Sequence, residues 1–304
     1  MRSCFHSRLE RLAAALAAGA MVELRMTPKP GLVDLADSGS HRDLSLPLME
    51  RSIGIVTPCL EEIAASLRAG ESFARQREIA CGAERRLAAE LGTNTHKGFI
   101  FLAGMLLVAG QRAGTFDERP LRKSLSAVSR VFFSGAAESD THGQQARRKY
   151  RVGGIVNEAI DAYPSLFEEA LPAFRRTLDR RGCLNLASFA MMARLMQTVC
   201  DTTTLHRRGI EGLARIRRDG RALERIILRG GDCVEYLERL NDDYRRLDLT
   251  MGGVADMLGI AFGWLIFADE IVPDGRGMVD CFEHVSSCAI NLTRKSHLKG
   301  IGPA

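Results

Sequence analysis

Apolar residues recur three and four positions apart along most of the chain, a spacing that places them on one face of an α-helix. In the first such stretch, Leu9, Leu12, Leu16 and Leu24 follow this spacing. The same pattern predicts helices at residues 9–26, 44–69, 73–91, 97–113, 121–133, 186–200, 234–247 and 254–269. Alternation of apolar and polar residues, which is typical of strands, is nearly absent. The pattern therefore predicts an all-α protein.

The stretches between these helices are short and carry glycine, proline and small polar residues, for example at residues 27–39 and 92–95. Neither a Pro/Ser-rich linker nor a repeat of fixed period divides the sequence. We therefore expect one compact domain of about a dozen helices over residues 1–304. The basic end, residues 294–304, is expected to be a mobile tail.

Composition narrows the class of protein further. The chain has 304 residues, 46% of them hydrophobic and 26% charged, which is typical of a soluble globular protein and unlike a disordered one. A net charge of +5 is far below the basic footprint of nucleic-acid binding, and no apolar run reaches the roughly 20 residues of a membrane span. The eight cysteines are scattered, as in a reduced protein. We therefore expect a cytoplasmic protein without nucleic-acid or membrane partners.

The first stretch that could carry chemistry is residues 27–34 (TPKPGLVD), followed closely by 38–43 (SGSHRD). Two prolines make it stiff, and a stiff loop can hold the charges of Lys29, Asp34, His41 and Asp43 in place. The alternative is a plain helix connection in which Asp43 caps the next helix. Both interpretations stay open from these residues alone.

The second stretch, residues 92–98 (GTNTHKG), leads into an apolar helix. Exposed backbone N–H groups at a helix start favour phosphate, and Lys97 adds a positive charge in the first turn. The spacing of a P-loop is missing and no strand precedes it, which excludes a Walker-type nucleotide site. His96 is either functional or a capping histidine.

Three further stretches are weaker signals. In residues 153–159 (GGIVNEA), Glu158 either has a raised pKa or serves as a cap or ion-pair partner. Residues 201–209 (DTTTLHRRG) follow the predicted helix 186–200. In residues 251–258 (MGGVADML), two glycines allow close backbone approach, and Asp256 is either a helix cap or a metal ligand.

The chain resembles the triphosphoribosyl-dephospho-coenzyme A synthase family over about residues 10–270. The resemblance rests on the order and residue content of six motifs, which are TPKPGLVD, GSHRD, NTHKG, GxxxEA, DTxxLHRxG and GGxADxL. The resemblance implies an all-α transferase that joins the ribose 2′-hydroxyl of 3′-dephospho-CoA to the anomeric carbon of ATP and releases adenine. It also implies Mg²⁺ bound with ATP. The product would pass to an acyl-carrier-protein transferase that serves citrate lyase or malonate decarboxylase.

The same resemblance suggests roles for the residues of these stretches, which we state as hypotheses. Acid–base and ribose-stabilising roles fall to His41, His96 and Glu158. The nucleotide and its phosphates would contact Lys29, Arg42, Asn94, Lys97, Gly252 and Gly253. The Mg²⁺ ion would bind one or two carboxylates drawn from Asp34, Asp43, Asp201 and Asp256.

The chain departs from the family pattern at several positions. An arginine of the family motif GARGEA is Val156 here, and an asparagine of DTN is Thr203. The family motif SPGGSAD carries changes at three positions, which are Thr250, Met251 and Val254 here. Lost polar groups weaken contacts to a polyanionic substrate. Three functions therefore stay open: the family reaction, transfer of a phosphoribosyl-type group to another acceptor, and nucleotide binding without catalysis.

Overall fold

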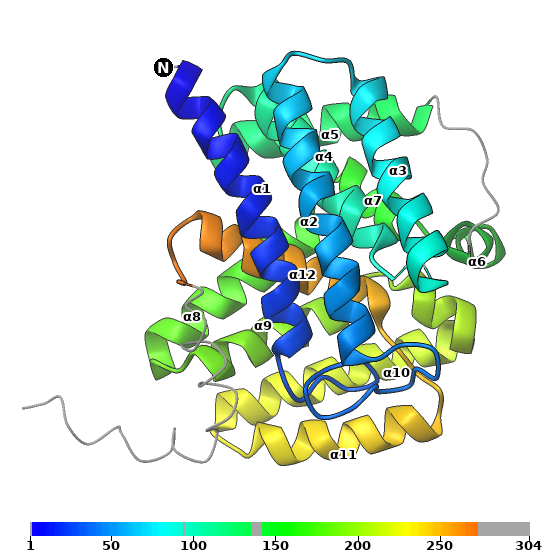
Figure 1. Cartoon of the computed structure of the whole chain (residues 1–304). Helices are drawn as coiled ribbons and strands as arrows, with labels where there is room; N and C mark the ends of the chain where they lie inside the picture. Colours follow the sequence, from blue (N-terminus) through cyan, green and yellow to red (C-terminus); the bar gives the residue numbers. More distant parts are fainter. Residues whose placement is uncertain (1, 94, 135–141, 273–304) are drawn as a thin grey trace, which may run out of the picture.

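The computed structural model describes residues 2–93, 95–134 and 142–272, and all regular structure within them is helical (Figure 1). The helices are Arg2–Arg25 (α1), Leu46–Arg68 (α2), Phe73–Leu91 (α3), Lys97–Ala113 (α4), Glu118–Ser134 (α5), His142–Tyr150 (α6), Ile155–Ile160 (α7), the π-helical segment Ser165–Ala170 (η1), Leu171–Arg181 (α8), Leu184–Thr198 (α9), Thr202–Arg229 (α10), Cys233–Arg246 (α11) and Gly252–Phe267 (α12). The predicted all-α class is confirmed.

All eight predicted helices exist, and the bounds of α3 and α4 agree at both ends. The sequence analysis missed α6, α7, η1, α8 and α10, although α10 extends from Thr202 to Arg229. Arginines and glycines separate the apolar positions of α10, and Gly209 bends it with a φ of 64°. Residues 201–209 therefore start a new helix, which the apolar pattern alone did not reveal.

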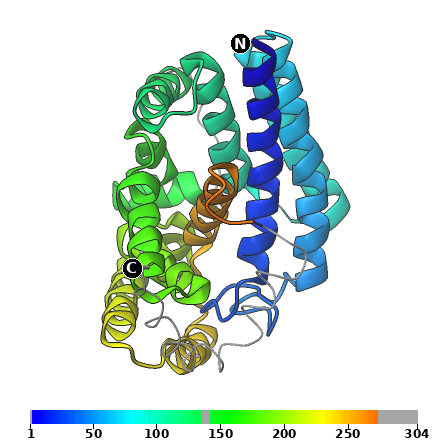
Figure 2. The same cartoon turned by 90° about the vertical axis from the view of Figure 1, so that its left-hand side faces the viewer.

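The most central helix is α12, which is apolar along most of its length and lies between α1 on one side and α9 and η1 on the other (Figure 2). Small residues let α1 and α12 approach closely. A Cβ atom at Gly19 would overlap the backbone of Gly263 and Gly259. This close contact fixes the position of α12, and therefore of its N-terminal end, against the first helix of the chain.

The described helices share one large core, and a small second cluster of Ala146, Leu205 and Leu213 joins α6 to α10. Cys59 and Cys233 are free, buried thiols. Among the described helices, no single one has the length and apolar character of a membrane span, and α4 with α5 meets that test only across a bend of 113°.

The loop of residues 26–45 crosses the lower ends of α1 and α2 and lies beside α10 and α11 (Figure 1). Gly31 donates its backbone N–H to Asn241 on α11, and the Ser40 hydroxyl donates to the Leu249 carbonyl. These bonds hold the first motif against the segment that leads into α12. The predicted mobile tail at residues 294–304 lies outside the described residues.

Candidate active site

A buried ion pair joins the end of α1 to the stiff loop. The Lys29 ammonium donates to the Glu23 carboxylate at 2.6 Å and to the Glu23 carbonyl at 2.5 Å. Lys29 is 1% exposed and Glu23 is 6% exposed. Burial raises the pKa of Glu23, although the charge of Lys29 opposes this shift. Because a lone charge buried this deeply would be very costly, each partner depends on the other.

Asp34 organises the same loop. Its carboxylate accepts the backbone N–H groups of Lys29 at 2.8 Å, Ala36 at 2.8 Å and Asp37 at 3.2 Å. Burial raises the pKa of Asp34 despite these bonds. The carboxylate therefore holds the Lys29 backbone in place beside Glu23.

Asp201 connects two helices. One carboxylate oxygen accepts the Thr204 N–H at 2.9 Å and caps α10, while the other accepts the Val254 N–H at 3.0 Å in the first turn of α12. Gly253 lies against this carboxylate, which also accepts its N–H. Burial raises the pKa of Asp201. Asp201 thus fixes the starts of α10 and α12 to each other.

Asp256 extends from α12 to the N-terminal end of α4. A Cβ atom at Gly98 would overlap its carboxylate, which accepts the Phe99 N–H. Burial, together with the negative charges of Asp201 and Glu23, raises the pKa of Asp256 well above its ordinary value. No cation is paired with it among the described residues. Asp256 is therefore the carboxylate of this region that is available for chemistry.

His96 precedes the first turn of α4 and is 5% exposed. Its Nδ1 lies 2.6 Å from the Ser52 hydroxyl, which comes from α2. Burial, with a smaller contribution from Lys29, lowers the pKa of His96 to about 4. The imidazole is therefore neutral at physiological pH.

His41 lies at the edge of this region. Its Nε2 is 2.9 Å from the Thr250 hydroxyl, and Arg207 faces its Nδ1 at 3.4 Å. Because a guanidinium only donates hydrogen bonds, Nδ1 is the acceptor and Nε2–H donates to Thr250. Burial and Arg207 lower the pKa of His41 to about 4. This arrangement joins the loop to α10 and to the segment before α12.

Glu158 makes a local contact. Its carboxylate accepts the backbone N–H of Ser165 at 2.9 Å and the Ser165 hydroxyl at 3.0 Å, where η1 begins. Burial raises the pKa of Glu158. The sequence left two interpretations of Glu158 open, a raised pKa or a role as a cap or ion-pair partner. In the structure Glu158 caps the start of η1, and its pKa is also raised.

Other predicted residues lie outside this cluster. The Lys97 ammonium is 2.7 Å from Glu84 on α3, and its side chain is 48% exposed. Arg42 is exposed, and the Asp43 side chain is 66% exposed. Asn94 lies outside the described residues.

The altered positions border the same region. Gly252 lies against Thr203, and Gly154 lies against Thr202 at the start of α10. Val156 is 6% exposed, and the Thr250 side chain bonds His41. Thus parts of all five stretches identified in the sequence lie close to the starts of α4, α7, α10 and α12.

Sequence reasoning missed three residues of the region. Glu23 follows Leu9, Leu12, Leu16 and Ala20 at helical spacing, so an acid on the buried face of α1 was a readable signal. Ser52 likewise shares the buried face of α2.

Arg147 gave no sequence signal. Its aliphatic stem lies near Gly154, and its buried Nε has no hydrogen-bond partner. Burial lowers the pKa of Arg147.

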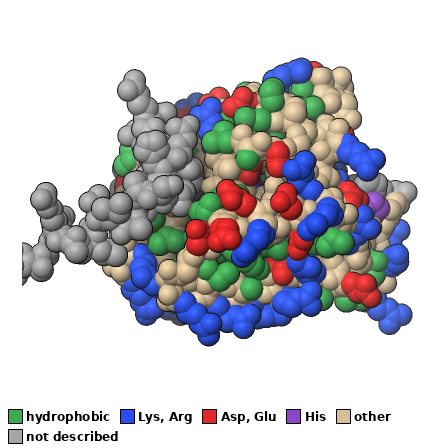
Figure 3. Space-filling view, turned by 90° about the horizontal axis from the view of Figure 1, so that it is seen from below, with side chains coloured by type: hydrophobic (Ala, Val, Ile, Leu, Met, Phe, Trp, Pro, Cys, Tyr) green, Lys and Arg blue, Asp and Glu red, His purple; other side chains and the backbone are tan. Residues whose placement is uncertain are grey.

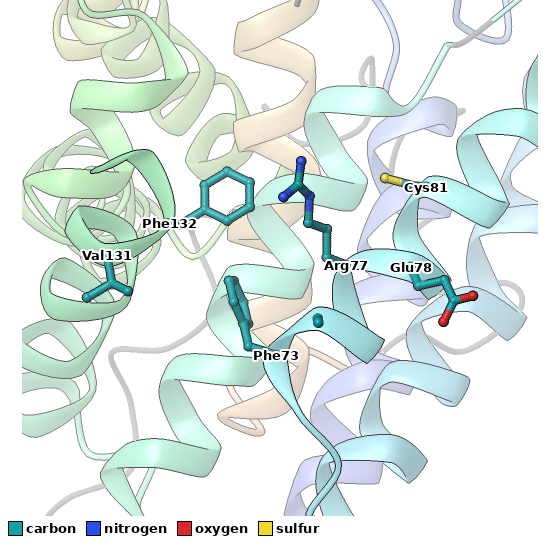
Figure 4. Close-up of a pocket in the computed structure, with 7 residues that line it drawn as sticks. Phe73, Arg77, Glu78, Cys81, Val131 and Phe132 are labelled. Carbon is teal, nitrogen blue, oxygen red and sulfur yellow. The ribbon is translucent and has the colours of Figure 1, made fainter. Parts of the chain in front are cut away.

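A separate pocket of about 440 Å³ lies between α3 and α5 (Figure 4). Phe73, Arg77 and Cys81 line it from α3, and Val131 and Phe132 line it from α5. The Arg77 guanidinium lies over the Phe132 ring, 5.8 Å from its centre. None of the predicted site residues lines this pocket.

The surface around α10 and α11 carries both signs of charge. Seen from below in Figure 3, Lys and Arg side chains follow one edge while Asp and Glu side chains lie further in. Arg215 pairs with Asp243 at 2.9 Å, and Arg245 pairs with Asp37 at 3.3 Å. Charge is therefore interspersed on this face.

The donor set does not form a metal centre of its own. Over the described residues, no three His, Cys, Asp or Glu side chains gather as ligands of one ion. Asp34 and Asp201 use both carboxylate oxygens as acceptors of backbone N–H groups. Backbone contacts thus occupy Asp34 and Asp201, and Mg²⁺ bound by one or two carboxylates together with the phosphates of ATP stays a prediction.

The fold and the site define an all-α protein with buried carboxylates, a lysine and a neutral histidine gathered where several helices begin. The family described as ATP:dephospho-CoA triphosphoribosyl transferase matches residues 9–271. The chain belongs to this family, as its motifs indicated.

Relatives agree with this assignment. A protein of Stutzerimonas stutzeri (strain A1501) named "Probable 2-(5''-triphosphoribosyl)-3'-dephosphocoenzyme-A synthase" is 32% identical, over 88% of this chain and 93% of the relative. A Klebsiella pneumoniae protein named "2-(5''-triphosphoribosyl)-3'-dephosphocoenzyme-A synthase" is 30% identical, over 87% of this chain and 96% of the relative. No solved structure matches the chain significantly.

Proposed function

We propose that this protein transfers the triphosphoribosyl group of ATP to the ribose 2′-hydroxyl of 3′-dephospho-CoA. The bond from the anomeric carbon of ATP to the adenine nitrogen breaks, and a bond from the same carbon to the 2′-oxygen forms. The hydroxyl loses its proton and adenine gains one, so the reaction is balanced. The triphosphate stays on the product.

The observation that supports this proposal best is the convergence of the family motifs on one buried site. The motifs come from distant parts of the chain, yet Lys29, His96, Asp201 and Asp256 are linked by contacts or by their charges. Breaking a glycosidic bond produces positive charge on the ribose, which nearby carboxylates stabilise. The site is rich in such groups.

Asp256 is the proposed base. Its carboxylate lacks a cation partner among the described residues, and its raised pKa makes it a better proton acceptor than an ordinary aspartate. It would take the proton of the attacking hydroxyl. Asp34, Asp201 and Glu23 hold the surrounding backbone and Lys29 in place.

The triphosphate is proposed to lie beside Arg147, whose buried Nε has no hydrogen-bond partner. A guanidinium binds phosphate oxygens with two parallel bonds. Mg²⁺ is proposed to arrive as the ATP complex, where it neutralises phosphate charge. Since the described carboxylates do not form a metal centre, no step is assigned to a resident ion.

The test is adenine release, followed by chromatography with MgATP in the presence and absence of 3′-dephospho-CoA. Release that requires dephospho-CoA, with a product mass that shows the added triphosphoribosyl group, is the expected result. The Asp256→Asn variant should bind ATP but release no adenine. Release that needs a different acceptor would contradict the proposal and support transfer to another molecule.

A second function has one specific observation in its favour. Val156, which replaces an arginine of the family motif, is buried and adds an apolar side chain beside the site. A changed acceptor would account for this loss of charge. Assays with other ribose-containing acceptors, scored by adenine release, separate the two functions.

A further inference from the structure

Three polar groups meet beneath His96. The Ser52 hydroxyl lies 2.6 Å from the His96 Nδ1 and 2.6 Å from the Thr95 hydroxyl. The Thr95 hydroxyl lies 3.2 Å from the same ring nitrogen. Ser52 is completely buried, on a helix distant in sequence. Such short contacts in a buried place fix the ring strongly.

The protons of this triangle can be counted. Each hydroxyl carries one proton, and a neutral imidazole carries one proton on one of its two nitrogens. If Nδ1 accepts from Ser52 and Ser52 accepts from Thr95, both hydroxyl protons are used inside the triangle. If Nδ1 donates instead, one of the two hydroxyl protons must leave the triangle, and no other acceptor for either hydroxyl is found among the described residues. The first arrangement satisfies every donor.

We infer that Ser52 and Thr95 are positioning residues that hold His96 as the tautomer with its proton on Nε2. Nε2 has no hydrogen-bond partner among the described residues, so its N–H is available to a substrate. A positive charge on the ring is disfavoured by burial and by Lys29. His96 is thus a neutral hydrogen-bond donor rather than a base.

The role of this donor rests on the proposed function. A neutral N–H can donate a hydrogen bond to a ring nitrogen of the departing adenine, which takes its proton from the solvent at another ring nitrogen, or to a phosphate oxygen. Asp256 would then accept the proton of the attacking hydroxyl, and His96 would stabilise the leaving adenine. The sequence named His96 as an acid–base candidate without deciding between these roles.

Nitrogen NMR of the full chain with ¹⁵N-labelled histidine rings tests the inference directly. His96 signals are identified by their loss in His96→Gln. At pH 7 we expect one neutral tautomer, with a protonated Nε2 and an unprotonated Nδ1. The Ser52→Ala variant should show a mixture of tautomers. A protonated Nδ1 in the wild type, or an unchanged His96 spectrum in Ser52→Ala, would overturn the inference.

Kinetics supply the second readout. Ser52→Ala should lower kcat for adenine release about 10-fold or more, within the range of acid–base contributions, while KM for ATP stays within about twofold. Ser66→Ala is the matched control, because Ser66 is a buried hydroxyl of the same helix that bonds Gln76 instead. It should leave both the His96 spectrum and kcat unchanged. An equal fall of kcat in the two variants would contradict a positioning role.

Two further arms keep the inference testable. If Ser52→Ala does not fold, Thr95→Val removes the second hydroxyl with little change of shape, and the same loss of the single tautomer is expected. If the wild type releases no adenine, the proposed function fails, but the ring spectra still decide whether Ser52 and Thr95 set the tautomer. The two failures are therefore distinguishable.

Discussion

Two cations that are proposed to bind phosphate, Arg147 and Lys97, differ in their surroundings. Lys97 is exposed and paired with Glu84, whereas the Nε of Arg147 is buried without a partner. We expect Arg147→Ala to raise KM for ATP about 10-fold or more, because a charged hydrogen bond contributes about 1.5–3 kcal/mol. Lys97→Ala is the comparison and should change KM by less than about threefold. Steady-state kinetics of adenine release measure both, and a larger effect of Lys97→Ala would reverse the assignment.

The buried His96 should make stability depend on pH. Its pKa of about 4 in the folded protein lies below the ordinary value of 6.5. As pH falls between these values, the unfolded chain binds a proton that the folded protein does not bind, so the free energy of unfolding falls. The linkage amounts to about 2 kcal/mol between pH 7 and pH 4.5. Urea unfolding at both pH values should show a smaller loss in His96→Gln, and an equal loss in both proteins would argue against this burial effect.

The sequence identified many of the residues that meet in the site but not their partners. Lys29, Asp34, His96 and Asp256 were chosen because they lie in stiff or glycine-rich stretches, and the resemblance to the family added Asp201. Glu23 and Ser52 were missed, since each lies inside a regular helix. Their contacts depend on which helices pack together, and this is a long-range property that no local pattern contains.

At the scale of the element, Asp201 caps α10 and also accepts a backbone N–H from α12. Asp201→Ala should therefore lower the free energy of unfolding by about 2–3 kcal/mol, since each lost cap costs up to about 2 kcal/mol. Asp232, which caps only α11 from an exposed position, provides the control. Asp232→Ala should cost about 1 kcal/mol by urea unfolding. Equal losses in the two variants would show that the second contact of Asp201 contributes nothing.

The contact of α1 with α12 provides a second test at this scale. Gly19→Ala would place a Cβ atom against the backbone of Gly263, which cannot move aside as a side chain could. Overpacking of this kind typically costs about 1–3 kcal/mol. Gly54→Ala is the matched control, because nothing lies within 4 Å of a Cβ atom there. It should raise stability by about 0.5–1 kcal/mol, as alanine favours helices. Destabilisation by both variants would contradict the packing argument.

Element prediction succeeded where apolar residues followed a continuous helical spacing, as in α3 and α4. It failed for α10, whose buried Leu205, Leu213, Ile216 and Leu223 are separated by arginines and interrupted at Gly209. The charged face of α10 is long because the helix covers the core from one side only. A narrow apolar stripe is therefore enough to pack α10 against the core. So narrow a stripe gives only a weak helical pattern in the sequence.

At the scale of the whole molecule, the site unites the end of α1, at Glu23, with the start of α12, at Asp256. The helices between them also contribute, so ligand binding should stabilise the entire fold. MgATP at about 100 times its dissociation constant should raise the free energy of unfolding by about 2.7 kcal/mol. Thermal unfolding with and without MgATP measures this gain.

The stabilisation by MgATP can also distinguish the proposed roles of Asp256 and Arg147, when it is measured in a variant of each residue. If Asp256 is the base, Asp256→Asn should keep the stabilisation by MgATP while adenine release disappears, because the substituted amide cannot accept the proton. If Arg147 holds phosphate, Arg147→Ala should lose most of the stabilisation at the same MgATP concentration. Arg75→Ala, on the far part of α3 among Glu62, Glu71 and Glu78, should keep both the gain and the turnover. Loss of the MgATP stabilisation in Asp256→Asn would instead assign Asp256 to holding the nucleotide or its metal ion, and the proton would need another acceptor.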